Sequence, residues 1–322
     1  MKSILKTILI LFSLLLNGCY MDDCDGPDGW GEFCSNVTYN CNGSECNQSD
    51  INIINKIIEL SNDINDGMDC NSNGDIEPQE FGRQVWDNGR ILELNISGDG
   101  NDKIEPQCKN VYVHHVDRLV LPDNIGDLDS LNILGIGTGT NFTNLPETIW
   151  NLNNLKDLSI GSNTLTSLSE NIGNLSNLEK LDLDLVGLDS LPKNIYSLTK
   201  LKELHISSPI ESFPDSILNL SDLNYLYLTN TNLTSLPETI VNLSSLKSLS
   251  VSNSQLISIP DSIGKLSNLS FLNLQHNKLT SIPESICSLP NNCYISVNYN
   301  KICDEKYRYD CIDNWGVQDC GE

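Results

Sequence analysis

Apolar residues recur along most of the chain with a regular spacing. From Leu121 onward, a phrase close to L-P-x-x-I-x-x-L-x-x-L starts at residues 121, 145, 168, 191, 213, 236, 259 and 282, at intervals of 22–24 residues. Each unit continues as L-x-x-L-x-L-x-x-N-x-L, as in LKDLSIGSNTL at 155–165 and LSFLNLQHNKL at 269–279. Internal periodicity of this kind is typical of solenoids, in which each unit contacts only its neighbours.

Each unit is predicted to contain two kinds of element. The L-x-L step alternates apolar and polar residues, which is typical of a short strand. In L-P-x-x-I-x-x-L-x-x-L, apolar residues three and four positions apart indicate a helical or irregular segment that returns the chain. One unit cannot bury its own apolar face. The eight units at residues 121–302 are therefore expected to stack into a curved parallel sheet with one continuous core.

These motifs resemble the leucine-rich repeat family over residues 121–302. The resemblance implies an α/β solenoid whose sheet is concave and whose helical or irregular segments are convex. It also implies that the asparagine of each unit turns inward and bonds the backbone of neighbouring turns, which would otherwise be buried unsatisfied. Three units keep this residue and three replace it: Asn163, Asn277 and Asn300, then Val186, Thr231 and Ser254.

Both ends of the repeat array are expected to carry caps, because the end units would otherwise expose leucines to water. Residues 89–97, GRILELNIS, are predicted to form an irregular strand that starts the sheet, and residues 111–122, VYVHHVDRLVLP, a second one. Residues 89–120 would then be the N-terminal cap. Residues 303–322, which are rich in cysteine, resemble a disulfide-stapled C-terminal cap.

The cysteines are confined to the two ends of the chain. The sequence has 12 of them, and none lies between residues 109 and 286. This distribution favours disulfides that staple both ends of the solenoid, in an oxidising compartment. Without Cys19 the number is odd, so at least one thiol is free or pairs between chains. The connectivity cannot be deduced from the sequence.

The N-terminus has the pattern of an export signal. Residues 1–18 place two lysines before a short apolar run, which is too short to span a bilayer and then stop. The phrase Leu16-Asn17-Gly18-Cys19 resembles the lipobox of bacterial lipoproteins. That resemblance implies lipidation at Cys19, followed by a cysteine-rich segment at 19–48. The chain would be exported and lipid-anchored to a bacterial membrane, at the outer membrane or cell surface. An ordinary secretory signal is the alternative.

Residues 69–80, DCNSNGDIEPQE, fit the EF-hand template D-x-[DN]-x-[DN]-G-x5-E in every specified place. A hard cation takes six to eight oxygens, and the glycine at loop position 6 permits the sharp turn. The predicted calcium ligands are Asp69, Asn71, Asn73, Asp75, Glu77 and Glu80. A helix is predicted at 49–60, so residues 49–88 would form a small EF-hand-like module that calcium stabilises. A polar turn in an asparagine-rich chain is the alternative.

Charge and motif content argue against several other functions. The chain has 43 acidic and 19 basic residues and a net charge of −24, which disfavours nucleic acid and anionic lipid surfaces. The four histidines are scattered, and neither H-E-x-x-H nor G-x-S-x-G occurs. The glycine-rich LGIGTGTN at 134–141 falls on a repeat strand and its turn, where no phosphate loop is expected. Asp182 and Asp184 alternate with leucines and are interpreted as a surface charge patch. No enzymatic activity is predicted.

The variable residues between the leucines are expected to project from the concave sheet. The predicted ligand-binding surface consists of Tyr225, Tyr227, Phe271, Asn273, His276, Tyr294 and Tyr299. Exposed aromatic side chains are frequent interaction anchors, although tyrosine also suits strands for structural reasons. The predicted function is that of a surface-anchored protein-binding or adhesion lipoprotein. The alternatives are a substrate-recognition accessory of an extracytoplasmic enzyme and an intracellular leucine-rich signalling scaffold.

Overall fold

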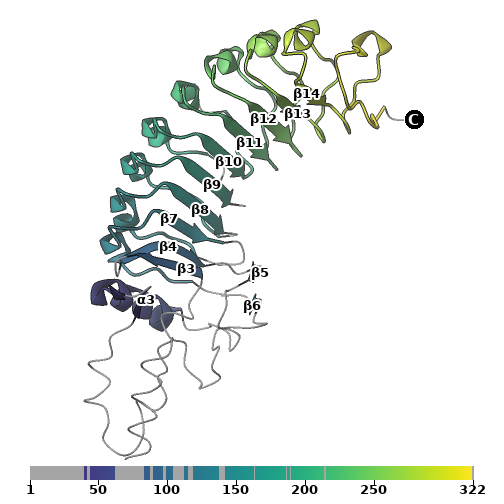
Figure 1. Cartoon of the computed structure of the whole chain (residues 1–322). Coiled ribbons are helices and arrows are strands. Elements are labelled where there is room, and N and C mark those ends of the chain that lie inside the picture. Colours follow the sequence, from purple (N-terminus) through teal and green to yellow (C-terminus); the bar gives the residue numbers. More distant parts are fainter. Residues whose placement is uncertain are drawn as a thin grey trace, which may run out of the picture.

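The computed structural model describes residues 40–41, 44–61, 83–87, 90–96, 99–103, 112–114, 119–137, 142–162, 164–185, 187–188, 190–213 and 215–320. Over these residues the chain forms an arc, with a sheet along its inner side and short helices along its outer side (Figure 1). The predicted α/β solenoid with a curved parallel sheet is confirmed. The sheet is concave, and the return segments lie on the convex side.

One sheet of ten strands runs through the described part of the chain. In spatial order it contains β14 (Tyr294–Ser296), β13 (Phe271–Asn273), β12 (Ser248–Ser252), β11 (Tyr225–Thr229), β10 (Glu203–Ser207), β9 (Lys180–Leu185), β8 (Asp157–Ser162), β7 (Ile133–Ile136), β4 (Arg90–Ile96) and β3 (Arg83–Asp87). Pairing is parallel from β4 to β14, and β3 pairs antiparallel with β4. Equivalent residues of successive units are neighbours: Leu204 pairs with Leu181 on one side and with Leu226 on the other.

The core lies between the sheet and the convex segments. Every second strand residue points into it, so that Leu181, Leu183 and Leu185 of β9 are fully buried while the residues between them are half-exposed. Apolar residues of every unit join a single buried cluster that extends into both caps. Because successive leucines stack in columns, burial of one unit depends on the next.

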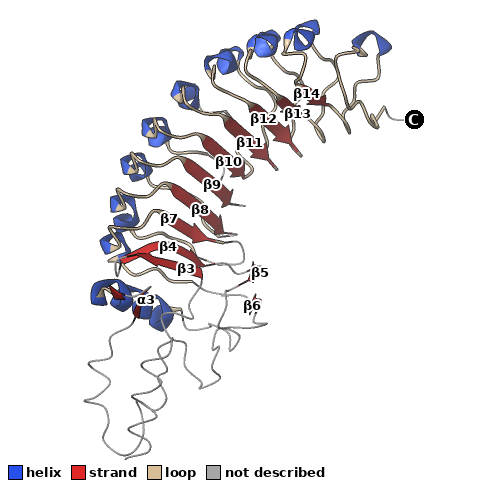
Figure 2. Cartoon of the chain, in the orientation of Figure 1, coloured by secondary structure: helices blue, strands red, loops and turns tan. Residues whose placement is uncertain are grey.

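The convex segments are single turns of 3-10 helix (Figure 2). They are η2 (Ile125–Asp127), η3 (Glu147–Asn151), η4 (Glu170–Asn174), η5 (Lys193–Ser197), η6 (Asp215–Asn219), η7 (Glu238–Asn242), η8 (Asp261–Lys265), η9 (Glu284–Ser288) and η10 (Glu305–Tyr307). In η3, the amide of Ile149 donates to the carbonyl of Pro146 at 3.1 Å, which is the three-residue step of this helix type. No helix in the described ranges is long and apolar enough to cross a membrane.

Side chains on the convex side link one unit to the next. The carboxylate of Glu238 accepts hydrogen bonds from the amides of Asp261 at 3.3 Å and Ser262 at 3.0 Å, which are at the start of η8. In the same way, the carboxylate of Glu170 accepts hydrogen bonds from the amides of Lys193 at 3.1 Å and Asn194 at 2.7 Å in the following unit. The first amides of a helix have no partner within it, so these carboxylates satisfy donors that the next unit leaves open.

A helix closes the N-terminal end of the core. The predicted helix at 49–60 is confirmed as α3 (Gln48–Leu60), and it begins one residue earlier because the side chain of Asn47 caps it. Its isoleucines at spacings of three and four residues form one apolar face, and four of them are fully buried: Ile51, Ile53, Ile54 and Ile57. They belong to the same cluster as the leucines of the repeats. The helix therefore covers the first turn of the solenoid.

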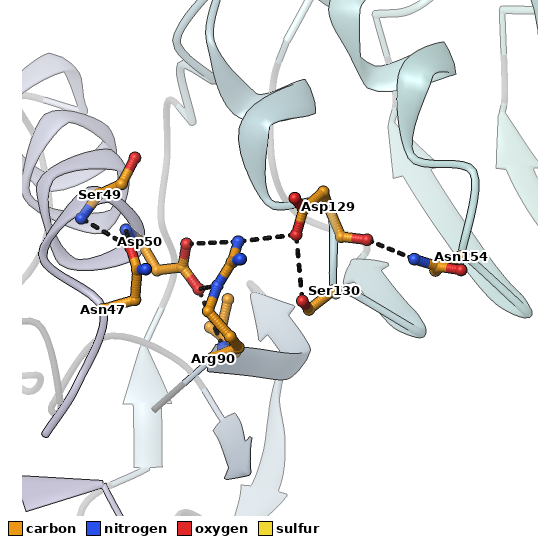
Figure 3. Close-up of polar contacts among 8 residues, drawn as sticks. Asn47, Ser49, Asp50, Arg90, Asp129, Ser130 and Asn154 are labelled. Atoms are coloured by element: carbon orange, nitrogen blue, oxygen red, sulfur yellow. Dashed lines mark hydrogen bonds and ion pairs between the residues drawn. The ribbon is translucent and has the colours of Figure 1, made fainter. Parts of the chain in front are cut away.

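A buried ion pair fixes α3 to the sheet (Figure 3). Asp50 is fully buried, and its carboxylate accepts from Arg90 Nε at 2.9 Å, Arg90 Nη2 at 3.0 Å and the amide of Ile91 at 3.0 Å. Arg90 Nη2 also lies 2.8 Å from Asp129 Oδ1, close to η2. The hydrogen bond to Asp50 raises the pKa of Arg90. A buried charge is costly unless it is paired and hydrogen-bonded, and Asp50 meets both conditions.

The N-terminal strands are arranged differently from the prediction. Residues 90–96 of the predicted strand at 89–97 form β4, but β4 does not start the sheet, because β3 covers its outer edge. Among the described residues of 111–122, the strand is β6 (Tyr112–His114), and it pairs with β5 (Asp99–Lys103) in a separate two-stranded sheet. A further short hairpin joins β1 (Asn40–Cys41) to β2 (Ser44–Glu45). An antiparallel hairpin closes over a short loop, whereas parallel pairing requires a long crossover.

The C-terminal cap covers the edge of β14. Backbone bridges join Ser296 to Asn314 and Asn300 to Gln318. Two disulfides hold this segment, between Cys287 and Cys311 and between Cys303 and Cys320, with Cα atoms 5.5 and 5.6 Å apart. The predicted stapling of this end is therefore confirmed. Cys293 is buried and free, and burial raises the pKa of its thiol to about 11.

Candidate functional site

Outward-pointing residues of the strands form rows across the concave face. Strand residues alternate between core and concave face, and the parallel register places equivalent positions side by side. Along β8 to β14, the first row reads Asp157, Lys180, Glu203, Tyr225, Ser248, Phe271 and Tyr294. The second row reads Ser159, Asp182, His205, Tyr227, Ser250, Asn273 and Ser296. The face thus changes from charged residues over β8–β10 to aromatic residues over β11–β14.

The aromatic platform comprises Tyr225, Tyr227, Phe271 and Tyr294. Tyr225 stacks on Tyr227 of the same strand with ring centroids 6.4 Å apart. Phe271 stacks on Tyr294 of the next strand at 5.8 Å. Tyr225 is 38% exposed and Tyr294 43% exposed, so these rings remain open to solvent although they sit on the sheet. The structure brings together four of the seven residues predicted for the ligand-binding surface.

Two serines occupy β12 between the two aromatic pairs. Ser248 lies between Tyr225 and Phe271 in the first row, and Ser250 between Tyr227 and Asn273 in the second. Each serine is only 6% exposed although it points away from the core. A small side chain on an outward position becomes buried when larger neighbours cover it. Asn273, a fifth predicted residue, donates from Nδ2 to Ser250 Oγ at 3.2 Å. The two aromatic pairs thus lie on either side of a strand whose own outward side chains are small and covered.

The two remaining predicted residues lie at the rim. His276 and Tyr299 follow β13 and β14 in the left-handed region, each with φ 54°. Asn230 and Asn253 take the same conformation after β11 and β12. The rings of His276 and Tyr299 stack with centroids 4.2 Å apart. These two residues extend the aromatic surface beyond the strand ends, at a position where the backbone conformation is constrained.

The acidic cluster, Asp182, Asp184 and Glu203, lies beside this platform on β9 and β10. Glu203 Oε1 is 3.0 Å from His205 Nε2 and 3.6 Å from Lys180 Nζ. The first contact is short but lacks hydrogen-bond geometry. His205 Nδ1 lies 3.9 Å from Asp182 Oδ2, and the His205 ring meets Tyr227 edge-on at 4.4 Å. Asp182 and Asp184 lie on the outward side of β9, and strand pairing places His205 and Glu203 of β10 beside them.

Partial burial affects the cluster electrostatically. It raises the pKa of Asp182, because leaving water disfavours the carboxylate, and the positive charges near it only partly offset this. Asp184 has no ion pair or hydrogen bond from its side chain to any described residue. The sequence signal for this grouping is the 23-residue spacing, which places Asp182 beside His205 once the strands are in register.

The predicted lipidation and calcium sites lie outside the described residues. This applies to Cys19 and to the whole loop at 69–80 with its six proposed ligands, and also to the repeat positions Asn163 and Val186. Among the residues that are described, no group of three or more His, Cys, Asp or Glu side chains could hold a metal ion.

A family profile for the leucine-rich repeat region matches residues 112–213 and 211–291, which together exceed half of the chain. The chain belongs to the leucine-rich repeat family. No protein of curated function matches the chain. Within each repeat, the aromatic platform and the acidic cluster occupy the variable outward positions, which lie between the leucines that are buried in the core.

Solved leucine-rich repeat structures share this architecture. The ectodomain of the membrane receptor kinase GASSHO1/SCHENGEN3 from Arabidopsis thaliana, solved with CASPARIAN STRIP INTEGRITY FACTOR 2, is 26% identical with a TM-score of 0.54, over 68% of this chain and 26% of that one. The type III effector XopL gives 25% identity and a TM-score of 0.50, over 65% and 69%. The leucine-rich repeat protein LIC12759 of Leptospira interrogans gives 28% and 0.48, over 66% and 61%. The chain thus spans less than two thirds of the Leptospira protein and about a quarter of the plant ectodomain.

Proposed function

We propose that the chain binds a protein or peptide ligand on the concave face of its solenoid. One observation carries this proposal: large aromatic side chains are exposed on strands β11, β13 and β14, whose inward positions are filled by buried aliphatic residues. Tyr225 and Tyr294 remain open, although the same strands bury Leu226 and Ile295 almost completely. Aromatic anchors contribute much contact area at little entropic cost.

The structural relatives support a peptide or protein as ligand. The plant ectodomain at 26% identity was solved in complex with CASPARIAN STRIP INTEGRITY FACTOR 2. Leucine-rich repeat regions serve as interaction scaffolds, and the proposal accordingly assigns binding and no catalysis to this chain. The surface-exposed aromatic residues match that role, because they lie on the concave side, whose curvature surrounds an extended ligand.

We further propose that the chain is exported and lipid-anchored at Cys19, at the outer membrane or cell surface of a bacterium. The C-terminal disulfides support an oxidising compartment. Stable anchoring requires more than one acyl chain, as lipoproteins carry. Growth with labelled palmitate should label the wild-type chain and leave a Cys19→Ser variant unlabelled. Equal labelling of both chains would refute anchoring at this residue.

We propose that calcium binds the loop at 69–80 and stabilises the N-terminal module. Only the sequence supports this site, through its match to the EF-hand template. Calorimetric titration of the full mature chain should give saturable binding with a Kd on the order of 10⁻⁴–10⁻³ M. Binding and any rise in melting temperature should both be lost in an Asp69→Ala, Glu80→Ala double variant. An unchanged titration of the variant would place the calcium elsewhere or reduce the loop to a polar turn.

The concave-face proposal is tested by selecting ligands from a random library, so that the natural partner need not be identified first. Phage-displayed dodecapeptides are selected on the full mature chain, and binders are compared on variants. We expect a Tyr225→Ala, Tyr294→Ala double variant to lose binding by tenfold or more, since anchors at a binding surface contribute about 2 kcal/mol. The matched control is Tyr196→Ala, because Tyr196 is 42% exposed on convex η5. Equal losses in both variants, or no loss in either, would refute a concave site.

A further inference from the structure

Resting on the proposed function, we propose that the ligand is an extended peptide that pairs a basic residue with an apolar one at a fixed spacing. The lysine or arginine lies over the acidic cluster on β9 and β10. An aromatic or other large apolar side chain lies on the aromatic platform over β11 to β14. The peptide therefore crosses the strands of the concave face.

Charge complementarity selects the basic residue. The acidic cluster contributes three carboxylates, and the single ammonium of Lys180 lies near one of them, Glu203. The carboxylate of Asp184 has no cationic partner among the described residues, and Asp182 has only His205 at 3.9 Å. A ligand cation between these two carboxylates would gain charge-assisted hydrogen bonds that the protein itself does not make. An acidic peptide would be repelled, because the whole chain carries a net charge of −24.

The platform selects the apolar residue. Its two stacked pairs lie on either side of β12, where Ser248 and Ser250 are almost completely covered and leave no bulky side chain between them. Rings that already stack in pairs, at 5.8 and 6.4 Å, lose little conformational freedom when a ligand packs on them. The edge-on contact of His205 with Tyr227 places the platform directly beside the acidic cluster. The two surfaces therefore form one continuous binding strip.

The strand register sets the spacing. Neighbouring strands lie about 4.8 Å apart, so β9 and the centre of the platform at β12 are three steps, or about 14 Å, apart. An extended peptide advances about 3.3 Å per residue. The basic and apolar residues are therefore about four positions apart in the ligand. Either chain direction satisfies this spacing, so the basic residue can precede or follow the apolar one.

The dodecapeptide selection provides the test, because the selected sequences report the ligand chemistry. We expect enrichment of a lysine or arginine about four positions from an aromatic or large aliphatic residue. Replacing that basic residue by glutamate in a synthetic peptide should abolish measurable binding in fluorescence anisotropy. Raising the salt concentration should weaken the unmodified peptide, since exposed charge pairs are screened.

Protein variants separate this inference from the proposed function. An Asp182→Asn, Asp184→Asn double variant keeps side-chain size and should weaken binding of the selected peptide by about tenfold. Its control is Asp261→Asn, Glu284→Gln, which removes the same charge from convex η8 and η9 and should leave binding unchanged. If binders depend on Tyr225 and Tyr294 but lack a basic residue or tolerate the aspartate changes, the inference falls and concave binding stands. If no binder depends on the tyrosines, both fall.

Discussion

The turns after the strands are held by different side chains near the C-terminal end of the solenoid and in its middle. After β13, Asn277 is buried, and its Nδ2 donates to the carbonyls of Val251 at 2.7 Å and Leu274 at 3.0 Å. Its Oδ1 accepts from the amide of Leu256 at 3.0 Å. Asn300 forms the equivalent bonds after β14. Each amide thus joins its own turn to the preceding unit.

In the middle, the same positions hold Thr231 and Ser254, which bond directly to each other. Their hydroxyl oxygens are 2.7 Å apart, and Ser254 Oγ also accepts from the amide of Thr231 at 3.2 Å and donates to the carbonyl of Ser252 at 3.0 Å. In both regions, a residue with a left-handed backbone precedes the position that the repeat motif gives to asparagine, as Asn230 and His276 show. The turn geometry therefore requires satisfied backbone groups, and asparagine is only one way to satisfy them.

Truncation of a core leucine should have the largest effect and should not distinguish the two regions. Leu226 of β11 and Leu272 of β13 are both fully buried in equivalent columns. We expect Leu226→Ala and Leu272→Ala each to lower the free energy of unfolding by about 2–5 kcal/mol, from lost transfer energy and the cavity that remains. Urea denaturation followed by circular dichroism measures both. A difference of several kcal/mol would show that the regions differ in core packing as well.

Loss of one buried repeat asparagine should have the next largest effect on stability. Asn277→Ala leaves a buried amide and buried carbonyls without their partner, and each such group costs about 1–3 kcal/mol. We expect the free energy of unfolding to fall by about 3 kcal/mol in the same denaturation experiment. Asn292→Ala, at an exposed position near the cap, controls for general effects of asparagine removal. If Asn277→Ala costs less than 1 kcal/mol, water replaces the amide and the hydrogen bonds of Asn277 are not needed for stability.

Loss of the hydroxyl pair in the middle should cost less. Thr231→Val keeps the shape of the side chain and removes its bond to Ser254 and the longer bond, at 3.4 Å, that Thr231 Oγ1 accepts from the amide of Leu233. Ser254 retains its bonds to the amide of Thr231 and the carbonyl of Ser252. We expect a loss of about 1 kcal/mol, the usual net contribution of one good hydrogen bond, because the bond from Leu233 is long and weak. Differential scanning calorimetry or urea denaturation detects it. A loss as large as that of Asn277→Ala would mean that the hydroxyl pair contributes as much to the free energy of unfolding as the asparagine does.

Much of the solenoid could be predicted because its signals are local and repeated. The alternation in KLDLDL at 180–185 fixes which residues of β9 are buried, and the 23-residue period fixes the strand register. The short return segments begin at proline in most units, as at Pro146, and their length allows only one helical turn. The aromatic platform followed from the same periodicity, because residues outside the leucine columns have to face the concave side.

Features that depend on one specific pairing could not be predicted. The bond between Thr231 and Ser254 joins residues 23 positions apart, and nothing in either local sequence indicates it. The pairing of Cys287 with Cys311 depends on how the cap folds over β14, since several connectivities fit the same cysteines. Burial of Ser248 results from the size of its neighbours on other strands. Such features follow from stacking of whole units, which a single-unit pattern does not describe.

The smallest effect on stability is expected on the convex side. There a carboxylate of a middle unit, Glu238, bonds the amides of the next unit, whereas the last unit has no following repeat to bond. Hydrogen bonds from the side chain and amide of Ser262 and the amide of Asp261 lower the pKa of Glu238 below its ordinary value of 4.5. Because the pKa is lower in the folded chain, this stabilisation is present above pH 4.5 and is lost as the pH falls through the folded value. Glu284 holds the same position in the last unit, and no repeat follows it.

Glu238→Gln should therefore reduce the acid sensitivity of the melting temperature, whereas Glu284→Gln should not. Melting is followed by circular dichroism at neutral pH and at several values below pH 4.5. The wild-type chain and Glu284→Gln should lose stability in parallel as the pH falls, and Glu238→Gln should start lower at neutral pH and lose less, because the carboxylate that titrates is absent. Identical pH profiles for all three chains would mean that solvent screening cancels the bond to η8, and that the convex side contributes nothing to the difference between the middle and the end of the solenoid.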